Sequence, residues 1–201
     1  MPKKLTEATM TEGMDWLISL DPRFKRVFDQ TGTPKIRQKA SGFSGLLQSI
    51  VSQQLSTAAA KTIWTRVKEA GYDSSEYLAQ AHDEQLRALG LSRQKIRYAR
   101  ALASATVDYE GLSRLKTTEV IDALTPILGI GEWTAQMYAL FALGHSDVFA
   151  PNDLGLQEGL RKMLELDSRP SAKVARDLAL PWSPWRSVAA LALWSYNDIV
   201  S

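Results

Sequence analysis

Residues 124–135 read Leu124-Thr125-Pro126-Ile127-Leu128-Gly129-Ile130-Gly131-Glu132-Trp133-Thr134-Ala135 and lie between two stretches with helical periodicity. Two glycines that bracket one apolar residue allow a tight turn and a close approach of the backbone to a neighbouring group. The side chain of Ile130 can then fill the space between the two helices, while the amides that begin the second helix face outward. Because a helix N-terminus favours an anion, this hairpin predicts a phosphate site. A Gly-x-Gly pair alone is equally typical of an ordinary helix–helix turn with a glycine cap.

The composition sets outer limits on the function. The 201 residues are 45% hydrophobic, which is enough for one compact unit or two small lobes. The absence of cysteine excludes disulfides, thiolate zinc sites and iron–sulfur clusters, and two histidines, His82 and His145, are too few for a metal centre. A net charge of +2 is too small for the overall charge of the protein to attract nucleic acid. Any affinity for nucleic acid must therefore come from local basic patches or from backbone amides. The basic side chains of residues 93–100 are typical of a solvated helix face and indicate a phosphate track only weakly.

Targeting signals are missing from the sequence. No window approaches the roughly 20 apolar residues of a membrane span, and no apolar stretch of signal-peptide length follows the N-terminus. We therefore expect an intracellular protein with no membrane partner, located in the cytoplasm with the nucleoid or, in a eukaryote, in the nucleus.

Hydrophobic periodicity predicts an all-α chain. Strand signals are scarce, whereas apolar residues recur at helical spacing almost throughout, as at Ile96, Ala99, Ala103 and Val107. Glycine and proline interrupt the periodic stretches. The expected helices span residues 9–19, 23–29, 43–54, 56–70, 75–80, 83–89, 92–108, 117–124, 131–143, 153–164, 171–179 and 184–198.

Asp153 follows Pro151-Asn152 and opens the next helix, 20 residues after Trp133. The simplest role of an isolated acid at this position is to cap its helix. The same helix N-terminus would also keep the carboxylate ionised, which suits a group that stabilises positive charge or orients a water molecule. The residue pattern leaves both roles open.

Two further segments have a structural and a functional interpretation. Most tryptophans belong in a core, but indole faces, such as those of Trp133, Trp194 and the Trp182 and Trp185 pair, can also line a pocket and attract a cationic base by about 0.5 to 2 kcal/mol. In Ser52-Gln53-Gln54-Leu55-Ser56-Thr57, a serine or threonine can cap the second of two helices, which places Gln54 and Leu55 on the turn. An apolar residue there is usually tucked inward, but a protruding leucine can wedge into a base stack and fill the space of an extruded nucleotide.

Together these motifs resemble those of the helix-hairpin-helix DNA glycosylases, and most closely those of the 3-methyladenine DNA glycosylase II group, which removes alkylated bases. Their order and spacing match over roughly residues 43–198. The chain resembles the compact form of the group, because it is too short for the additional N-terminal β-rich domain of larger members. The residues that carry the resemblance are Leu128–Ala135, Asp147–Asp153, Ser52–Ser56, Pro184–Ser187 and Trp194.

The resemblance implies an all-α, two-lobed fold with a substrate cleft between the lobes. Residues 43–145 would form the helix-hairpin-helix bundle, and residues 1–42 with 146–201 would form a second helical lobe that carries Asp153. By position, Asp153 matches the catalytic aspartate. The other implied site residues are Trp133, Trp194 and Met137 in the substrate pocket, Leu55 as the intercalating wedge with Gln54 beside it, and Leu128, Gly129, Ile130, Gly131 and Glu132 on the DNA backbone. The resemblance requires no organic cofactor, but implies a sodium or potassium ion held by the carbonyls of Thr125, Ile127 and Ile130.

The implied function is that of a monomeric, monofunctional glycosylase in base excision repair, which flips an alkylated purine from duplex DNA and hydrolyses its N-glycosidic bond. Lyase members of the superfamily have a lysine where this chain has Trp133, so base removal alone is implied. Met137, where a relative can have tyrosine, and Asn152, which replaces an acid, leave the lesion range open among 3-methyladenine, 7-methylguanine, hypoxanthine and ethenoadenine. The alternative of a different class is a non-catalytic DNA-binding module, in which Asp153 only caps its helix.

Overall fold

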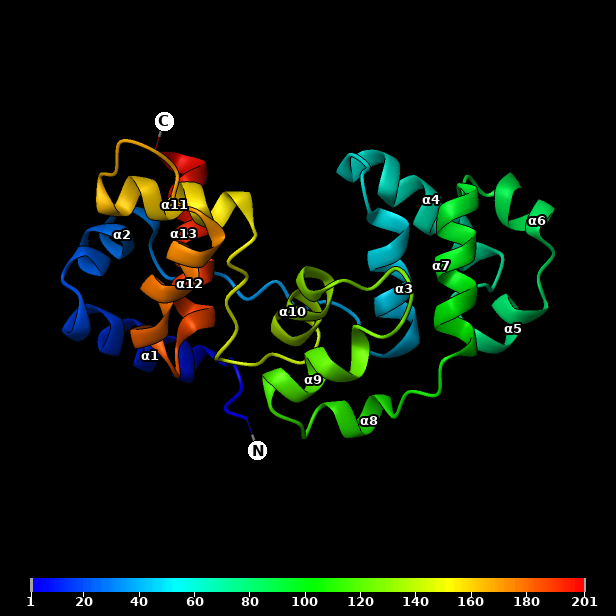
Figure 1. Ribbon diagram of the computed structural model, residues 1–201, viewed down its shortest axis with the longest axis horizontal. Helices are drawn as coiled ribbons and strands as arrows, with labels where there is room; N and C mark the ends of the chain where they lie inside the picture. The colour runs from blue at the N-terminus through cyan, green and yellow to red at the C-terminus, as the bar shows by residue number, and fades with distance from the viewer. Residues whose placement is uncertain (1, 201) are drawn as a thin grey trace. The chain divides into compact units, whose positions relative to one another are not determined.

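The computed structural model describes residues 2–200, which form helices joined by short loops (Figure 1). Within these residues the only extended pairing is an isolated antiparallel bridge between Lys4 and His145. The all-α prediction is therefore confirmed. None of the described helices is both long and apolar enough to cross a membrane.

The chain folds as two compact units, which we call the hairpin unit, residues 39–138, and the terminal unit, formed by the chain before and after it. The sequence placed this division at 43–145. One boundary instead falls inside a continuous helix over residues 132–141, where no sequence signal interrupts the helical pattern. At the other boundary, the amide of Gly42 donates a hydrogen bond of 2.8 Å to the hydroxyl of Tyr138, and both residues belong to the hairpin unit.

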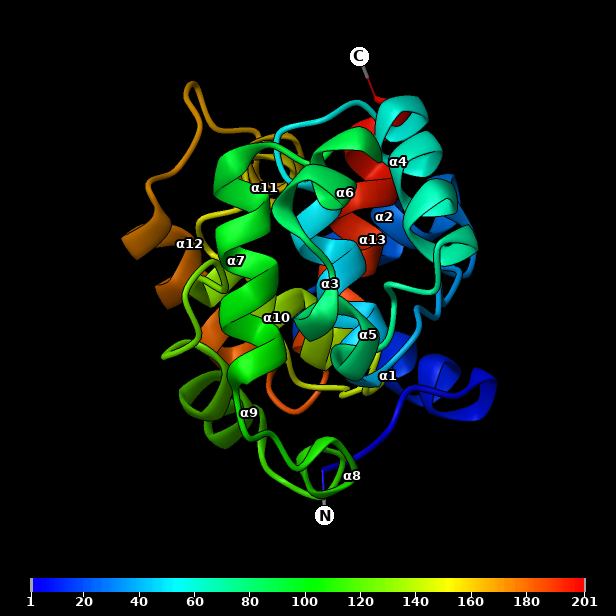
Figure 2. The same cartoon turned by 90° about the vertical axis from the view of Figure 1, so that its right-hand side faces the viewer.

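The hairpin unit is built around α3, which contacts α4, α7 and α8, while α5 and α6 pack against α7. Figure 2, which faces this unit, shows α7 beside α3. The expected helix over 92–108 ends early, at Ser104, because Asp108 caps a separate short helix by accepting a 2.8 Å hydrogen bond from the amide of Gly111. The helices are α3 (Gly42–Ser52), α4 (Thr57–Glu69), α5 (Ser75–Gln80), α6 (Asp83–Ala88), α7 (Arg93–Ser104), α8 (Tyr109–Leu112), α9 (Thr117–Leu124) and α10 (Glu132–Phe141).

The terminal unit is organised by its last helix, α13, which contacts α1, α2 and α11. Eight residues of α13 are buried, so the helix is enclosed on more than one face. At Gly159 of α11 a Cβ atom would lie 2.5 Å from the carbonyl oxygen of Leu193, so only glycine permits this approach of α11 to α13. The elements are α1 (Glu7–Leu20), α2 (Arg23–Thr31), α11 (Leu154–Leu164), α12 (Ala172–Ala179), the 3₁₀ helix η1 (Leu180–Trp182) and α13 (Arg186–Ile199).

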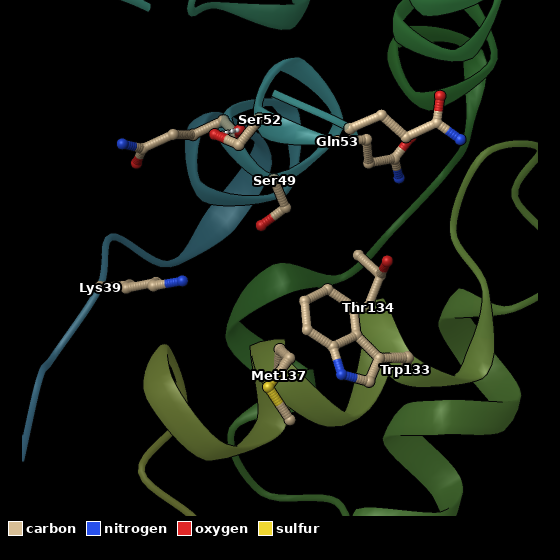
Figure 3. Close-up of a pocket in the computed structure, with 9 residues that line it drawn as sticks. Lys39, Ser49, Ser52, Gln53, Trp133, Thr134 and Met137 are labelled. Atoms are coloured by element: carbon tan, nitrogen blue, oxygen red, sulfur yellow. Dashed lines mark hydrogen bonds between the residues drawn. The ribbon is translucent and has the colours of Figure 1, made fainter. Parts of the chain in front are cut away.

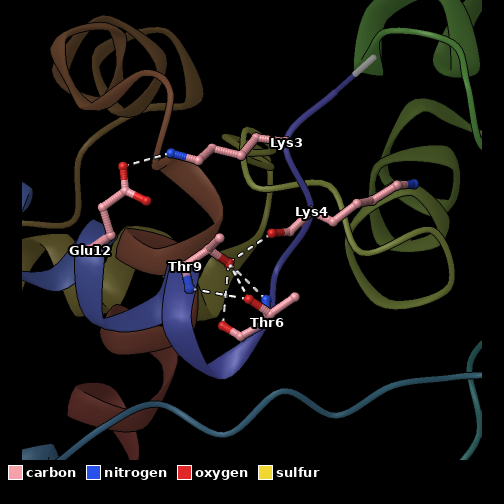
Figure 4. A network of polar contacts seen from close by, with 5 residues as sticks. All are labelled: Lys3, Lys4, Thr6, Thr9 and Glu12. Carbon is pink, nitrogen blue, oxygen red and sulfur yellow. Dashed lines mark hydrogen bonds and ion pairs between the residues drawn. The ribbon is translucent and has the colours of Figure 1, made fainter.

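The segment before α1 is fixed to that helix by a capping box, shown in Figure 4. The Thr6 amide donates to Oγ1 of Thr9 at 2.7 Å, and the Thr9 amide donates to Oγ1 of Thr6 at 3.2 Å. Nζ of Lys3 forms an ion pair of 2.6 Å with Glu12 and lies 4.2 Å from the ring centre of Trp185. These bonds explain why α1 begins at Glu7, two residues before the expected start.

His145 has a structural role in the terminal unit. Its side chain is fully buried, and its backbone pairs with the N-terminal segment. The amide of Leu5 donates to the carbonyl of Gly144 at 2.7 Å, and the amide of Ser146 donates to the carbonyl of Lys3 at 3.0 Å. Burial, assisted by the positive charge of Lys4, lowers the pKa of His145 to about 4.

This lowered pKa predicts that the protein loses stability in mild acid. Between pH 6.5 and about 4 the unfolded chain binds a proton at His145 that the folded chain does not. The contribution of His145 to the free energy of unfolding is therefore complete above pH 6.5 and falls by on the order of 3 kcal/mol as the pH drops through this window. Denaturant titrations at several pH values from 7.5 to 4.5 measure how the free energy of unfolding changes with pH.

Two variants test whether this pH dependence of stability comes from His145. His145→Gln should flatten the stability profile between pH 6.5 and 5, whereas His82→Gln, which changes an exposed histidine, should retain it. A wild-type stability that is constant over this range would contradict a neutral, buried His145.

Candidate functional site

The hairpin between α9 and α10 has the plugged geometry expected from its sequence. The Ile130 side chain is only 3% exposed, which confirms that it fills the space inside the turn. Gly129 has φ +95°, and a Cβ atom there would lie 2.3 Å from Cγ of Tyr98. A Cβ atom on Gly131 would meet no protein atom within 4 Å. The first glycine is thus required by the fold, whereas the second leaves open space beside the backbone.

That open space lies at the start of α10. The amide of Ala135 donates to the carbonyl of Gly131 at 3.0 Å, so Gly131 provides the first helical acceptor. The amides of the first turn have no carbonyl ahead of them within the helix, and they carry the positive end of the helix dipole. The carboxylate of Glu132 accepts a 3.0 Å bond from Nε2 of Gln136, one turn along the helix. The backbone at Gly131 is therefore suited to an anion.

The turn between α3 and α4 presents Leu55 on the surface. Leu55 is 38% exposed, and Gln54 before it adopts a left-handed conformation with φ +55°. Ser56 caps α4 by accepting a 3.3 Å hydrogen bond from the amide of Ala59. The sequence allowed Leu55 to be either tucked inward or protruding, and in the structure its side chain is exposed.

Gln53 joins this turn to the hairpin. Its Nε2 donates a 2.9 Å hydrogen bond to the carbonyl of Gly129. The two segments that the sequence predicts to contact DNA are thereby fixed to each other within the hairpin unit. No role for Gln53 is visible in the sequence, because a single glutamine in a motif does not show which distant carbonyl it binds.

A pocket in the hairpin unit collects several of the predicted residues (Figure 3). It has a volume of about 400 Å³ and lies between α3, the turn that follows it and α10. Trp133 is 47% exposed at its wall, and Met137 is buried beside it. We call this cavity the Trp133 pocket. Its lining residues are Lys39, Gln48, Ser49, Ser52, Gln53, Gln54, Trp133, Thr134 and Met137.

In the terminal unit, Asp153 is the N-cap of α11 and is also bound by Trp194. Its Oδ1 accepts a 3.0 Å bond from the amide of Leu156 and a 2.9 Å bond from Nε1 of Trp194. Trp194 in turn stacks on Phe141, with ring centres 5.9 Å apart. The capping interpretation of Asp153 is therefore confirmed. The bond to Trp194, which no sequence spacing indicated, shows that capping is not its only contact.

The Pro184–Ser187 motif holds the loop that leads to Asp153. Oγ of Ser187 donates to the carbonyl of His145 at 2.7 Å and accepts from the amide of Val148 at 2.9 Å. Arg186 donates two bonds, of 2.6 and 2.8 Å, to the carboxylate of Asp147. Burial raises the pKa of Asp147, but the bonds and charge of Arg186 outweigh this effect and keep the pKa below its ordinary value. The loop is thus anchored by an ionised pair.

These motifs are those of a known family. Residues 47–184 match the HhH-GPD superfamily of base excision DNA repair proteins. The chain belongs to this superfamily. The resemblance recognised in the sequence is therefore confirmed.

Individual members of the HhH-GPD superfamily are similar along most of their length. DNA-3-methyladenine glycosylase 1 of Schizosaccharomyces pombe is 30% identical over 203 residues, covering 95% of this chain and 89% of that protein. The structure of a DNA-3-methyladenine glycosidase from Bacillus halodurans has a TM-score of 0.84 and 31% identity, covering 99% of this chain and 93% of that one. The structure of the Schizosaccharomyces pombe 3-methyladenine DNA glycosylase in complex with abasic DNA has a TM-score of 0.78 and 30% identity, covering 91% of this chain and 95% of that one.

The structure groups the predicted HhH-GPD site residues into two sets. Asp153 and Trp194 form one set in the terminal unit. The hairpin, the Leu55 turn and the Trp133 pocket form the other set, within the hairpin unit. Lys39 and Ser49 join this second set without having been predicted, because each is an isolated polar residue outside the quoted motifs.

Two of the basic side chains on α7 have structural partners instead of facing a phosphate track. Nζ of Lys95 donates to the carbonyl of Val51 at 2.6 Å, at the C-terminal end of α3. Arg100 donates to the carbonyls of Leu78 and Ala79, both at 3.0 Å, at the end of α5. Cations are favoured at helix C-termini, so these contacts stabilise the hairpin unit.

The carbonyls expected to hold a monovalent cation belong to the hairpin turn. The carbonyl of Ile127 accepts a 2.9 Å bond from the amide of Ile130, and a carbonyl oxygen has a second lone pair to offer. Thr125 is the C-cap of α9, where carbonyls lack donors within the helix. These neutral oxygen donors fit a sodium or potassium ion.

Proposed function

We propose that this protein is a monofunctional DNA glycosylase that acts as a monomer, extrudes an alkylated purine of the 3-methyladenine type from duplex DNA and hydrolyses its N-glycosidic bond. The observation that carries the proposal is the Asp153 carboxylate, held at a helix N-terminus by the Leu156 amide and the Trp194 indole. A helix cap alone needs no indole donor. The names of the similar proteins support the substrate class.

DNA binding is assigned to the hairpin unit. The amides from Leu128 to Glu132 would hold a backbone phosphate, and a monovalent cation on the carbonyls of Thr125, Ile127 and Ile130 would add positive charge there. Leu55, on the turn that Gln53 ties to the hairpin, would fill the space left by the extruded nucleotide. The exposed indole of Trp133 would stack against the extruded base, with an additional cation–π attraction when the base is positively charged.

Bond cleavage is assigned to Asp153. Alkylation at N3 or N7 makes a purine cationic, so the electron pair of the C1′–N9 bond can pass to the base and release it as a neutral molecule. Positive charge then develops on the sugar, where the carboxylate stabilises it. A water molecule adds its oxygen to C1′ and loses a proton. Charge stabilisation by a group that is already in place avoids the cost of reorganising solvent.

The lysine nucleophile of the lyase members is replaced by Trp133. An indole cannot form a Schiff base with the abasic sugar, so the reaction would end with an intact abasic strand. This agrees with hydrolysis as the only chemical step.

An excision assay tests the proposal directly. Duplexes that each carry 3-methyladenine, 7-methylguanine, hypoxanthine or ethenoadenine are incubated with the protein, and released bases are identified by chromatography. We expect free 3-methyladenine together with an uncleaved abasic strand. Binding to every duplex without release of any base would instead favour the non-catalytic DNA-binding module.

The wedge role of Leu55 is tested by Leu55→Ala. Burial of an exposed leucine in a base stack contributes about 1.5 to 3 kcal/mol, so the variant should bind abasic duplex at least about tenfold more weakly. Fluorescence anisotropy with labelled abasic DNA measures the change. Leu20→Ala removes another exposed leucine, on α1, and should bind as the wild type does. Equal affinities of Leu55→Ala and the wild type, with equal excision rates, would exclude the wedge.

A further inference from the structure

Gly155 lies in the first turn of α11, directly against the hydrogen bond between Asp153 and Trp194. A Cβ atom at this glycine would lie 3.1 Å from Oδ1 of Asp153. It would also lie 3.1 Å from Cδ1 and 3.3 Å from Nε1 of Trp194. Oδ1 and Nε1 are the two ends of the 2.9 Å bond that joins the carboxylate to the indole. A side chain at position 155 would therefore press on both partners of this bond.

The backbone conformation does not explain why glycine occupies this position. Gly155 lies within α11, and its φ is outside the left-handed region that favours glycine. Glycine weakens a helix relative to alanine, because it loses more conformational freedom on folding. Since helix stability would favour a larger residue here, the reason for glycine lies in the space beside the backbone.

One helical turn further along, Gly159 sets how closely α11 approaches α13. Residues four apart lie on the same face of a helix, and this face of α11 is turned toward Leu193 and Trp194 of α13. Nearer the end of α11, Nζ of Lys162 donates a 3.0 Å bond to the carbonyl of Asn197. The two helices are thus held together at several levels (Figure 1), which fixes the distance between the carboxylate and the indole.

The indole of Trp194 is also restrained by an aromatic neighbour. Phe141 stacks on it with the two ring planes 27° apart, and the indole is half-buried. A methyl group at position 155 would push on the edge of the indole that carries Nε1. Because Phe141 limits the movement of the ring, the push would lengthen the hydrogen bond or shift the carboxylate.

We propose that Gly155 is a positioning residue for the chemical step. Its missing side chain leaves the space in which Trp194 donates to Asp153, so the carboxylate is held where positive charge develops on the sugar. Gly155 itself supplies no reacting group and acts through these two neighbours. This inference rests on the proposed glycosylase function and adds to it the residue that keeps the carboxylate in place.

The expected effect follows from the distances. A separation of 3.1 Å between carbon atoms is shorter than the optimum of about 3.5 to 4.0 Å. In Gly155→Ala the indole, the carboxylate or both must therefore move by a few tenths of an ångström. A misplacement of about 1 Å can cost about a hundredfold in rate, so we expect this smaller shift to cost about tenfold.

Single-turnover release of 3-methyladenine from a duplex tests this expectation. Gly155→Ala should release the base about tenfold more slowly and should bind an abasic duplex as tightly as the wild type does. Gly32→Ala is the matched control. It adds a methyl group in open space at the C-cap of α2, in the same unit and at φ +67°, so it lowers stability without displacing a neighbour. It should release the base at the wild-type rate.

A second measurement does not depend on activity. Each indole N–H group gives a signal in a proton–nitrogen correlation spectrum, and the signal of Trp194 is identified by its loss in Trp194→Phe. Gly155→Ala should move this signal, because it alters the bond to Asp153, whereas Gly32→Ala should not. In the Trp194→Phe background, which lacks the indole donor, Gly155→Ala should slow base release by a smaller factor than it does in the wild type.

The outcomes separate this inference from the proposed function. If the wild type releases no base, the proposed function fails and the role of Gly155 in it falls as well. If the wild type releases the base but Gly155→Ala releases it equally fast, or leaves the Trp194 signal unmoved, the glycosylase function stands and the role of Gly155 is overturned. Equal slowing by Gly155→Ala and Gly32→Ala would also overturn it, because lost stability would then explain both. Thermal unfolding above the assay temperature shows that each variant is folded.

Discussion

Replacement of Asp153 by asparagine is expected to slow base excision by at least about a hundredfold while leaving the affinity for DNA unchanged. The amide oxygen of asparagine can still accept hydrogen bonds from the Leu156 amide and the Trp194 indole, so the cap of α11 survives. Only the negative charge is removed. Loss of one preorganised electrostatic group costs about 2.7 to 4 kcal/mol of transition-state stabilisation, which corresponds to this loss of rate.

Single-turnover release of 3-methyladenine and binding to an abasic duplex measure the two quantities separately. Asp167→Asn removes an exposed carboxylate from the loop after α11 and should leave both unchanged. Wild-type excision by Asp153→Asn would show that this carboxylate merely caps its helix. A parallel loss of DNA affinity would show that the substitution disturbs more than the chemical step.

The second large effect is expected from the two hairpin glycines, which should respond to alanine in different ways. Gly129→Ala places a residue with a side chain at φ +95° and its Cβ atom 2.3 Å from Cγ of Tyr98. The conformation alone costs about 1 to 3 kcal/mol, and the contact is made at the base of the tyrosine ring, where the side chain moves least. We expect a loss of roughly 3 kcal/mol or more in the free energy of unfolding, or about 10 °C in Tm.

Gly131→Ala should change the free energy of unfolding by less than about 0.5 kcal/mol, because its methyl group meets no protein atom within 4 Å. If a phosphate approaches this backbone, the methyl group should weaken DNA binding by about tenfold through the loss of a charge-assisted hydrogen bond. Thermal unfolding measures the stability of both glycine variants, and fluorescence anisotropy measures their affinity for DNA. Wild-type DNA affinity of Gly131→Ala would remove the start of α10 from the DNA interface.

Local patterns in the sequence predicted the helices and the hairpin well. Helical periodicity depends on neighbours a few residues apart, so α5 and α9 begin and end as expected at residues 75–80 and 117–124. The burial of Ile130 followed from its place between two glycines. The end of α7 and the short α8 were missed, because the Asp108 cap competes with continued helix and the periodic pattern does not show which of the two prevails.

The sequence by itself determined the fold class, the family and the identity of Asp153 as the acid at the head of α11. These properties depend on spacing along the chain, which is visible without a structure. Only the tertiary structure decided that Trp194 donates to Asp153, that Gln53 ties the Leu55 turn to Gly129, and that Lys39 lines the Trp133 pocket. The residues in each of these relations are 41, 76 and more than 90 positions apart in the chain, respectively. Contacts over such separations are selected by the packing of whole helices, and no local pattern encodes which side chains that packing brings within hydrogen-bonding distance.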